Sequence, residues 1–98
     1  MGMLYSRRIK HKGLRLLYED GDESRLSAQS VDRLKRILAA LNVITAAEEL
    51  DLPGYGFHQL KGNRRGTYAL TVTRNWRLTF CWDSDGPFDV NLEDYHGR

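Results

Sequence analysis

The sequence is poor in cysteine, proline and histidine. Its 98 residues include one cysteine, two prolines and three histidines. Cys81 has no partner for an internal disulfide and no second thiol for a cysteine-based metal site, so we interpret it as a packing residue. His11, His58 and His96 are too far apart in the sequence to form a recognisable zinc signature. We therefore expect no bound metal and no cofactor.

Long hydrophobic runs are also missing. No apolar segment approaches the roughly 20 residues that a membrane helix needs. The N-terminal region carries Arg7, Arg8, Lys10 and Lys12 without the apolar stretch of a signal peptide. The length, with 41% hydrophobic residues, suits one modest core. We expect a single domain over residues 1–98, in the cytoplasm and without a membrane partner.

The charge is nearly balanced, with 15 basic and 13 acidic residues and a formal net charge of +2. The basic residues are nevertheless clustered, at Arg7–Lys12, Arg33–Arg36 and Lys61–Arg65. Local basic patches attract phosphate backbones, but a charge run is also typical of a solvated helix face. Nucleic-acid binding and simple solvation are both open at this point.

Two helices are predicted in the first half of the chain. Leu14, Leu17 and Tyr18 form an apolar stripe that indicates a helix from about residue 10 to 20, ended by Gly21. Apolar residues at three- and four-residue spacing then predict a stronger helix, with Ser27 as its N-cap. These apolar residues are Val31, Leu34, Ile37, Leu38 and Leu41.

A further helical turn or two is predicted between the second helix and the point where the hydrophobic period changes. Thr45 and Glu48 stand at the interval of a capping box, which favours a short helix beginning there. The Pro53-Gly54 pair then ends the helical pattern.

The second half of the chain alternates with a period of two, which indicates β-strands. The expected strands are Phe57–Lys61, Tyr68–Thr73, Trp76–Asp83 and Phe88–Asp94. The apolar positions that define the inner face are Tyr68, Leu70, Val72, Trp76, Leu78, Phe80, Trp82, Phe88, Val90 and Leu92. The other face presents polar residues such as Thr79, Asn91 and Glu93. Together these elements predict an α+β fold, with the helices packed on one face of a mainly antiparallel sheet and the other face free.

Groups able to transfer protons occur next to cations in the strand region. Arg77 lies in mid-strand, and the last strand leads into Asp94-Tyr95-His96. Together with His58 and Lys61, these residues suit phosphoryl transfer without a metal. A base would take the proton of a 2′-hydroxyl, an acid would protonate the leaving oxygen, and cations would stabilise the charged phosphorane.

Each of these residues also has a plain structural interpretation. Arg77 can form an ion pair with Glu93 across the sheet. Tyr95 and His96 can be frayed terminal residues. His58 falls, by period two, on the side of Leu60, which suits a satisfied core histidine. The pattern alone therefore supports a small basic α+β domain and leaves its chemistry open.

Several short segments, in a fixed order, resemble the HigB-type toxins of the RelE/ParE superfamily. The similar segments are Ile9-Lys10-His11-Lys12-Gly13-Leu14, Glu49-Leu50-Asp51-Leu52-Pro53-Gly54, Phe57-His58-Gln59-Leu60-Lys61-Gly62, Asn75-Trp76-Arg77-Leu78-Thr79-Phe80 and Glu93-Asp94-Tyr95-His96. They cover nearly the whole chain.

The resemblance implies a RelE-like fold and a ribosome-dependent endoribonuclease that cleaves messenger RNA in the A site of the small ribosomal subunit. By similarity, His58 and Asp94 are candidates for the proton-transfer pair, Tyr95 and His96 for substrate positioning and further acid–base work, and Lys61 and Arg77 for phosphate contact. The basic clusters then become candidate RNA contacts. These contacts are Lys35, Arg36, Lys61, Arg64 and Arg65.

The resemblance also implies a partner, a HigA-like helix-turn-helix antitoxin. This chain would then bind operator DNA only through the antitoxin. Two alternatives stay open. One is a ParE-like toxin that inhibits DNA gyrase, against which the Asp94-Tyr95-His96 ending argues. The other is a non-catalytic RNA- or ribosome-binding module.

Overall fold

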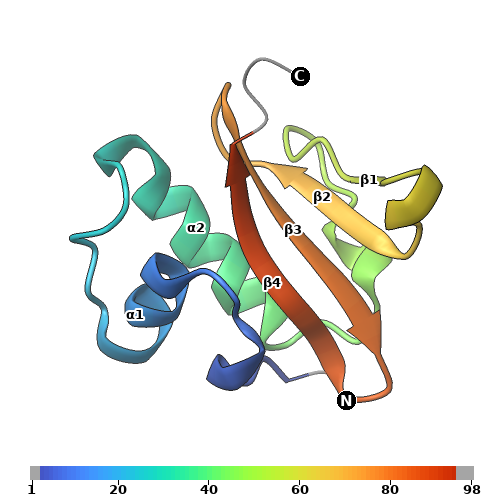
Figure 1. Ribbon diagram of the computed structural model, residues 1–98, viewed down its shortest axis with the longest axis horizontal. Coiled ribbons are helices and arrows are strands. Elements are labelled where there is room, and N and C mark those ends of the chain that lie inside the picture. The colour runs from blue at the N-terminus through green and yellow to red at the C-terminus, as the bar shows by residue number, and fades with distance from the viewer. Residues whose placement is uncertain (1–2, 95–98) are drawn as a thin grey trace.

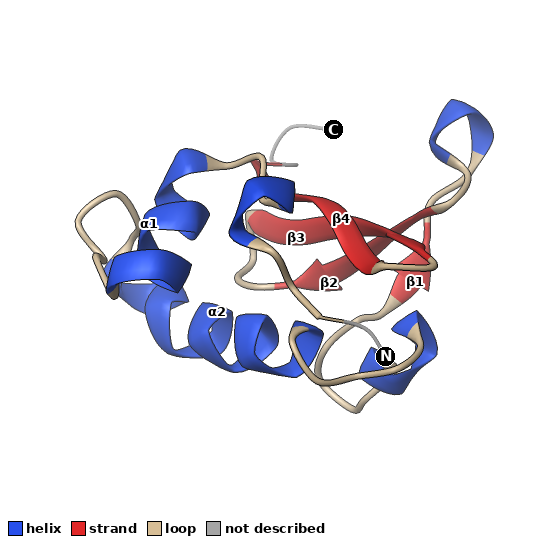
Figure 2. Ribbon diagram, turned by 90° about the horizontal axis from the view of Figure 1, so that it is seen from below, coloured by secondary structure: helices blue, strands red, loops and turns tan. Residues whose placement is uncertain are grey.

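Helices and strands form two layers in the computed structural model, which describes residues 3–94 (Figure 1). The helical layer covers one face of a four-stranded antiparallel sheet, as the view from below makes plain (Figure 2). This arrangement confirms the expected α+β fold. Among residues 3–94, none of the helices has the length and hydrophobicity that a membrane span requires.

The first helix, α1, spans Lys12–Asp20 and follows a 3-10 helix at Ser6–Arg8. His11 caps it, because its Nδ1 accepts a hydrogen bond from the backbone N–H of Leu14 at 3.2 Å. Gly21 ends it in the left-handed conformation (φ 69°), as expected for a glycine after the last turn. The predicted helix is confirmed, and the cap at His11 explains why it begins two residues later than the apolar pattern suggested.

The second helix, α2, spans Ala28–Leu41 and begins after Ser27, the predicted N-cap. The Ser27 hydroxyl pairs with that of Ser30 at 2.8 Å and makes no hydrogen bond to the helix backbone. A 3-10 helix at Ala47–Leu50 follows. The prediction that Glu48 caps it was wrong, because the carboxylate of Glu49 accepts the N–H of Thr45 at 2.8 Å.

The sheet is a meander in which each strand pairs with the next in the chain. β1 is only His58–Gln59, β2 is Thr67–Thr71, β3 is Trp76–Asp83 and β4 is Gly86–Asp94. The predicted strand at residues 57–61 is therefore much shorter than expected. It gives way to a 3-10 helix at Gly62–Arg64, which begins with Gly62 at a φ of 68°.

The core lies between α1, α2 and the inner face of the sheet. Leu14, Leu34, Ile37, Leu78 and Phe80 are all fully buried. The expected inner face is confirmed for nine of its ten positions, which are fully buried or packed against this core. These positions are Tyr68, Leu70, Val72, Trp76, Leu78, Phe80, Trp82, Val90 and Leu92.

Phe88 is the exception, and the prediction that it faces the core was wrong. The register pairs it with Cys81, which lies on the other face, because a β-bulge interrupts the pairing between Thr79 and Cys81. Asp89, inside this irregular stretch, has a φ of 50°. One extra residue in a strand reverses the facing of everything beyond it, and periodicity alone does not reveal the insertion.

A segment near the start of the chain closes the outer edge of β4. Ile9 forms a parallel bridge with Val90, and the Lys10 N–H donates to the Val90 carbonyl at 2.7 Å. Arg8 anchors the segment through two hydrogen bonds to the carboxylate of Asp83, at 2.9 and 3.0 Å. The sheet edge is thus covered by residues from the opposite end of the sequence.

Candidate active site

The helices leave one face of the sheet uncovered, and we call it the open face (Figure 2). Strand register aligns its side chains in rows across the sheet, so that residues distant in sequence become neighbours about 4.8 Å apart. One row contains Ala69, Thr79 and Asn91, and the next contains Thr71, Arg77 and Glu93.

Glu93 is the centre of the polar network on the open face. Its carboxylate accepts two hydrogen bonds from the Arg64 guanidinium, at 2.9 and 2.6 Å. It also accepts one from Arg77 at 3.2 Å and one from the buried hydroxyl of Thr79 at 2.8 Å. The hydrogen bonds from Arg64, followed by those from Thr79 and Arg77, lower the pKa of Glu93 from 4.5 to about 2 even though burial opposes the shift.

This network confirms that Arg77 forms an ion pair with Glu93 across the sheet. The same carboxylate holds Arg64, one of the predicted RNA contacts, in a bidentate pair. Two guanidinium groups and one carboxylate leave one net positive charge. The arrangement keeps two planar donor groups, each of a geometry that suits phosphate oxygens, close to one point of the open face.

His58 is exposed, so its interpretation as a buried core histidine was wrong. Its register partner is Ala69, which places it on the open face in the row of Thr79, about 10 Å away across two strand spacings. Its Nδ1 lies 2.8 Å from the carbonyl oxygen of Gly56. In the neutral ring Nδ1 must then carry the proton, which leaves the lone pair of Nε2 able to accept one.

Gly56 makes this position of His58 possible. It has a φ of 59°, and a β-carbon there would lie 2.6 Å from the hydroxyl oxygen of Thr71. Only glycine allows the chain to approach β2 this closely before β1 begins. The loop before β1 therefore fixes both the backbone carbonyl that orients His58 and the strand that carries it.

A polar pocket of about 220 Å³ occupies the open face beside the Glu93 network. The bulge in β4 contributes Asp89 to its wall, and Cys81 also lines it. Cys81 is half-buried and its thiol lies 3.4 Å from the Thr67 hydroxyl, so it belongs to the open face and not to the core. Other residues of this polar pocket include Lys10, Asn63, Arg64, Thr79, Asn91 and Glu93.

The remaining predicted RNA contacts divide between the two layers. Lys61 and Arg65 are exposed at either end of the 3-10 helix that follows β1, near Arg64 in the chain. Lys35 and Arg36 lie on α2, so the sheet separates them from the open face. Lys35 forms an ion pair with Glu23 at 2.9 Å. The structure brings together Arg64, Arg77 and His58 on one face, and does not bring Lys35 or Arg36 to it.

The C-terminal part of the predicted site is only partly described. Asp94 ends β4 opposite Trp76, and the alternation of β3 puts that pair on the helix-facing side, away from Arg77. Trp76 packs against the core, as predicted. Tyr95 and His96 lie outside the described residues. The roles of Asp94, Tyr95 and His96 stay predictions.

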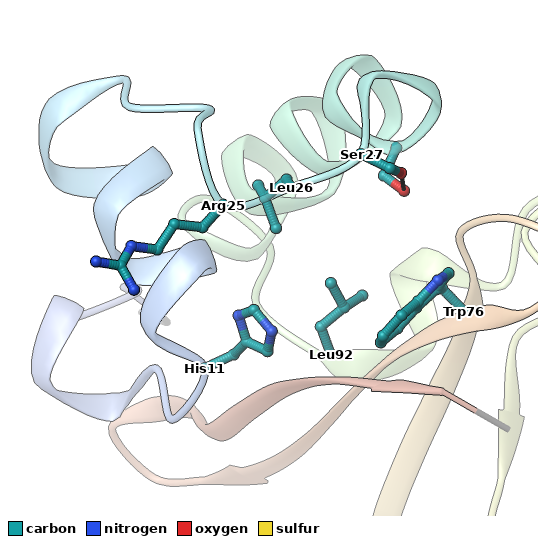
Figure 3. Close-up of a pocket in the computed structure, with 7 residues that line it drawn as sticks. His11, Arg25, Leu26, Ser27, Trp76 and Leu92 are labelled. Carbon is teal, nitrogen blue, oxygen red and sulfur yellow. Dashed lines mark hydrogen bonds between the residues drawn. The ribbon is translucent and has the colours of Figure 1, made fainter.

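A second, smaller hollow of about 80 Å³ opens on the helix-facing side (Figure 3). His11, Leu92 and Trp76 line it from below, and Leu26 closes it from the loop before α2. Burial lowers the pKa of His11, which favours the neutral ring that caps α1. We interpret this hollow as part of the packing between the two layers.

Glu93 is the functional-site residue that the sequence did not single out for chemistry. Its pairing with Arg77 was an expected alternative, but Arg64 joins it from 29 residues away, through the unpredicted 3-10 helix at Gly62–Arg64. Within residues 3–94, no group of three or more histidine, cysteine, aspartate or glutamate side chains could hold a metal ion.

Residues 7–96 match the family described as RelE-like toxins of the type II toxin–antitoxin system HigB. The chain is also 44% identical over 88 residues to a protein named Endoribonuclease HigB from Proteus vulgaris, a match that covers 90% of this chain and 96% of the relative. It is 36% identical over 76 residues to Toxin HigB-1 of Vibrio cholerae serotype O1, covering 76% and 80% of the two chains.

The two-layer fold and the cationic open face define a small RelE-like toxin domain. The chain belongs to the HigB-like family of type II toxin–antitoxin toxins. The resemblance inferred from the short segments of the sequence is confirmed.

Proposed function

We propose that this toxin is an endoribonuclease that cleaves messenger RNA in the ribosomal A site without a metal cofactor and so stops translation. The observation that carries the proposal is the placement of His58, Arg64 and Arg77 on one open face, in a chain that is 44% identical to a protein named an endoribonuclease. The ribosome, working in the cytoplasm, supplies the exposed messenger.

We infer the steps of the cleavage from the orientation of His58. The Nε2 of His58 is oriented to accept a proton, because Nδ1 is engaged by the Gly56 carbonyl. When a base removes the proton of the 2′-hydroxyl, that oxygen attacks the adjacent phosphorus and the bond to the 5′-oxygen breaks. The leaving oxygen takes a proton from an acid, and the product ends in a 2′,3′-cyclic phosphate.

The remaining residues have supporting roles in this proposal. Arg77 stabilises the charge that develops on the phosphorane, and Lys61 and Arg65 contact the RNA backbone. Arg64, whose guanidinium is held by Glu93, contacts the RNA beside Arg77. Tyr95 and His96 supply the other proton-transfer group and position the substrate, and Asp94, which lies on the helix-facing side at the end of β4, supports them from there. Lys35 and Arg36, on the helical layer, make a second contact with ribosomal RNA.

The partner in this proposal is a HigA-like helix-turn-helix antitoxin. The antitoxin inhibits the toxin by adding bulk that prevents entry into the ribosome, and operator DNA is reached only through it. Co-expression with a helix-turn-helix protein encoded beside the toxin should restore growth and yield a complex that co-purifies. Capture of DNA gyrase instead would favour a ParE-like function.

Cleavage itself is tested with purified protein and programmed ribosomes, by mapping the cut sites through primer extension. Cleavage should persist when divalent metals are chelated from ribosomes stabilised by other means, and the product should carry a cyclic or 3′-phosphate. A strict need for a metal, or a 5′-phosphate product, would overturn the mechanism. Ribosome binding without any cleavage would return the chain to the binding-module interpretation.

The role of His58 as the general base is tested by His58→Ala, with Gln59→Ala as a matched control. Both residues are exposed on β1, but Gln59 pairs with Tyr68 and therefore faces the other side. His58→Ala should slow single-turnover cleavage by about 10²-fold or more, and the control should leave it unchanged. Equal effects of the two substitutions would remove His58 from the mechanism.

The C-terminal residues are tested by deleting Tyr95 to Arg98, alongside the single substitution His96→Ala. If they work in the site, the deletion should abolish cleavage and leave the free energy of unfolding nearly unchanged, because little core lies beyond Leu92. A deletion variant that cleaves at the original rate would show that these residues are only a tail.

A further inference from the structure

We propose that the polar pocket on the open face binds the base of a nucleotide that flanks the cleaved bond, and that the amides of Asn63 and Asn91 recognise this base. This inference rests on the proposed ribonuclease activity and adds to it a specificity-determining site.

The charge of the pocket favours a base over a phosphate. Its charged residues balance, since Lys10 and Arg64 are matched by Asp89 and Glu93. Arg64 is moreover held by Glu93 in a bidentate pair, so its charge is largely compensated. A phosphate would meet two carboxylates here, whereas a neutral polar group meets no net charge.

The uncharged groups of the pocket match the edge of a base. Each asparagine amide offers two donors and one acceptor, and the hydroxyl of Thr67 adds a group that can serve as either. Nucleobases present donors and acceptors side by side on one edge, and asparagine amides pair with such edges through two hydrogen bonds. Two amides from separate elements, a 3-10 helix and β4, give the pocket two independent points of recognition.

The position of the pocket fits a nucleotide next to the one being cleaved. Arg64 and Glu93 form a wall of the pocket and belong at the same time to the network that holds Arg77. Asn91 lies two residues before Glu93 on the same face of β4, about 6.8 Å along the strand. The volume of about 220 Å³ is several times the roughly 30 Å³ of one water molecule, which leaves room for a planar ring.

The β-bulge is part of how the pocket is built. It brings Asp89 to the rim and turns Phe88 out of the core onto the open face beside Cys81. Bulges are frequent next to functional sites, where they redirect side chains. A regular strand would have kept Phe88 against the core.

The test uses programmed ribosomes that carry a messenger library randomised around the A site, with sequencing of the cut ends. Asn91→Ala and Asn63→Ala are the test variants, and Gln29→Ala, an exposed amide on α2, is the matched control. Asn63 lies outside the sheet, so its variant remains informative if Asn91→Ala folds poorly. We expect the original protein to prefer certain bases at one position beside the cleaved bond. Each test variant should reduce that preference by at least about fivefold, measured as the ratio of kcat/KM for two messengers that differ in that base.

The outcomes separate the pocket from the chemistry. Cleavage with a base profile that neither test variant changes would overturn the pocket and leave the ribonuclease function intact. The same holds if the original protein shows no base preference at any flanking position. Absence of cleavage by the original protein would overturn the ribonuclease function, and the pocket proposal with it.

Discussion

The two faces of the sheet are held by different interactions, although they alternate along the same strands. On the helix-facing side Leu78 and Phe80 are fully buried among apolar side chains. On the open face, Arg77 and Thr79 donate hydrogen bonds to Glu93. These two residues are the immediate neighbours of Leu78 along β3. The helix-facing side is stabilised by burial of apolar surface, an effect that does not depend on the orientation of the groups. The open face depends on a few oriented charges and hydrogen bonds.

The sharpest way to test this contrast is to truncate one residue on each face at neighbouring positions of β3. Phe80→Ala should lower the free energy of unfolding by about 3–5 kcal/mol, because a fully buried ring that stacks on Tyr68 is replaced by a cavity. Cys81→Ala, the matched change on the open face, should cost about 1 kcal/mol or less. Denaturant titration measures both, and similar losses for the two variants would contradict the division of roles.

Arg77→Ala should show the reverse pattern, with a large effect on activity and a small one on folding. If Arg77 has the proposed role at the phosphorane, its loss should slow single-turnover cleavage by roughly 10²-fold, or about 3 kcal/mol in the barrier. Thermal unfolding should change little, since Glu93 keeps its hydrogen bonds from Arg64 and Thr79. Arg77→Lys keeps the charge and loses the planar guanidinium, so its cleavage rate should lie between those of the original protein and of Arg77→Ala. A variant that unfolds but retains its chemical rate when folded would place Arg77 among the structural residues.

Acid should weaken the open face through Glu93. Because the folded-state pKa of Glu93 is lowered from 4.5 to about 2, its contribution to stability is fully present above about pH 5 and is lost as pH falls toward 2. The shift corresponds to about 3 kcal/mol. Urea titrations of the original protein and of Glu93→Gln should differ by about this amount at neutral pH and converge near pH 2. A constant difference at all pH values would mean that Glu93 does not titrate as its surroundings imply.

The smallest effect on chemistry is expected on the helical layer. Lys35→Glu combined with Arg36→Glu should weaken ribosome association and make the remaining binding less dependent on salt, because the two proposed phosphate contacts are removed. The cleavage rate of complexes that have already formed should stay the same. Binding assays over a range of salt concentrations, paired with single-turnover rates, separate these two quantities. A slower chemical step would place α2 closer to the reaction than the two-layer arrangement does.

The alternation of residue types was sufficient to predict most of the helix-facing side. The burial of Leu70, Leu78 and Val90 follows directly from a period of two, because a sheet with one buried face requires apolar residues at alternate positions. The same argument failed at Phe88, where an extra residue in the bulge reversed the facing. It also misplaced His58, because Phe57, just before the short β1, packs inward and His58 lies on the open face.

The open face was harder to predict because its contacts join residues that are far apart in the chain. The ion pair of Arg77 with Glu93 can be predicted because the two residues lie on neighbouring strands. Arg64 joins this pair only because the segment after β1 folds into a 3-10 helix. No local pattern indicates which of several arginines meets a given carboxylate. The resemblance to a family supplied the candidate roles of His58 and Arg77, and the structure supplied the partners of each.

The closure of the β4 edge has a consequence for the order in which the chain folds. β3 and β4 are joined by a two-residue turn and can pair as soon as both exist, whereas Arg8 and Asp83 are 75 residues apart in the chain. Contacts between distant residues carry a larger loop-closure entropy and form later. The segment around Ile9 leaves the ribosome first but has no strand to join until Val90 has emerged. Between the pairing of β3 with β4 and the docking of this segment, the β4 edge is open to strands of other molecules. The charged neighbours Arg8 and Lys10 disfavour such pairing on the segment that will finally cover this edge.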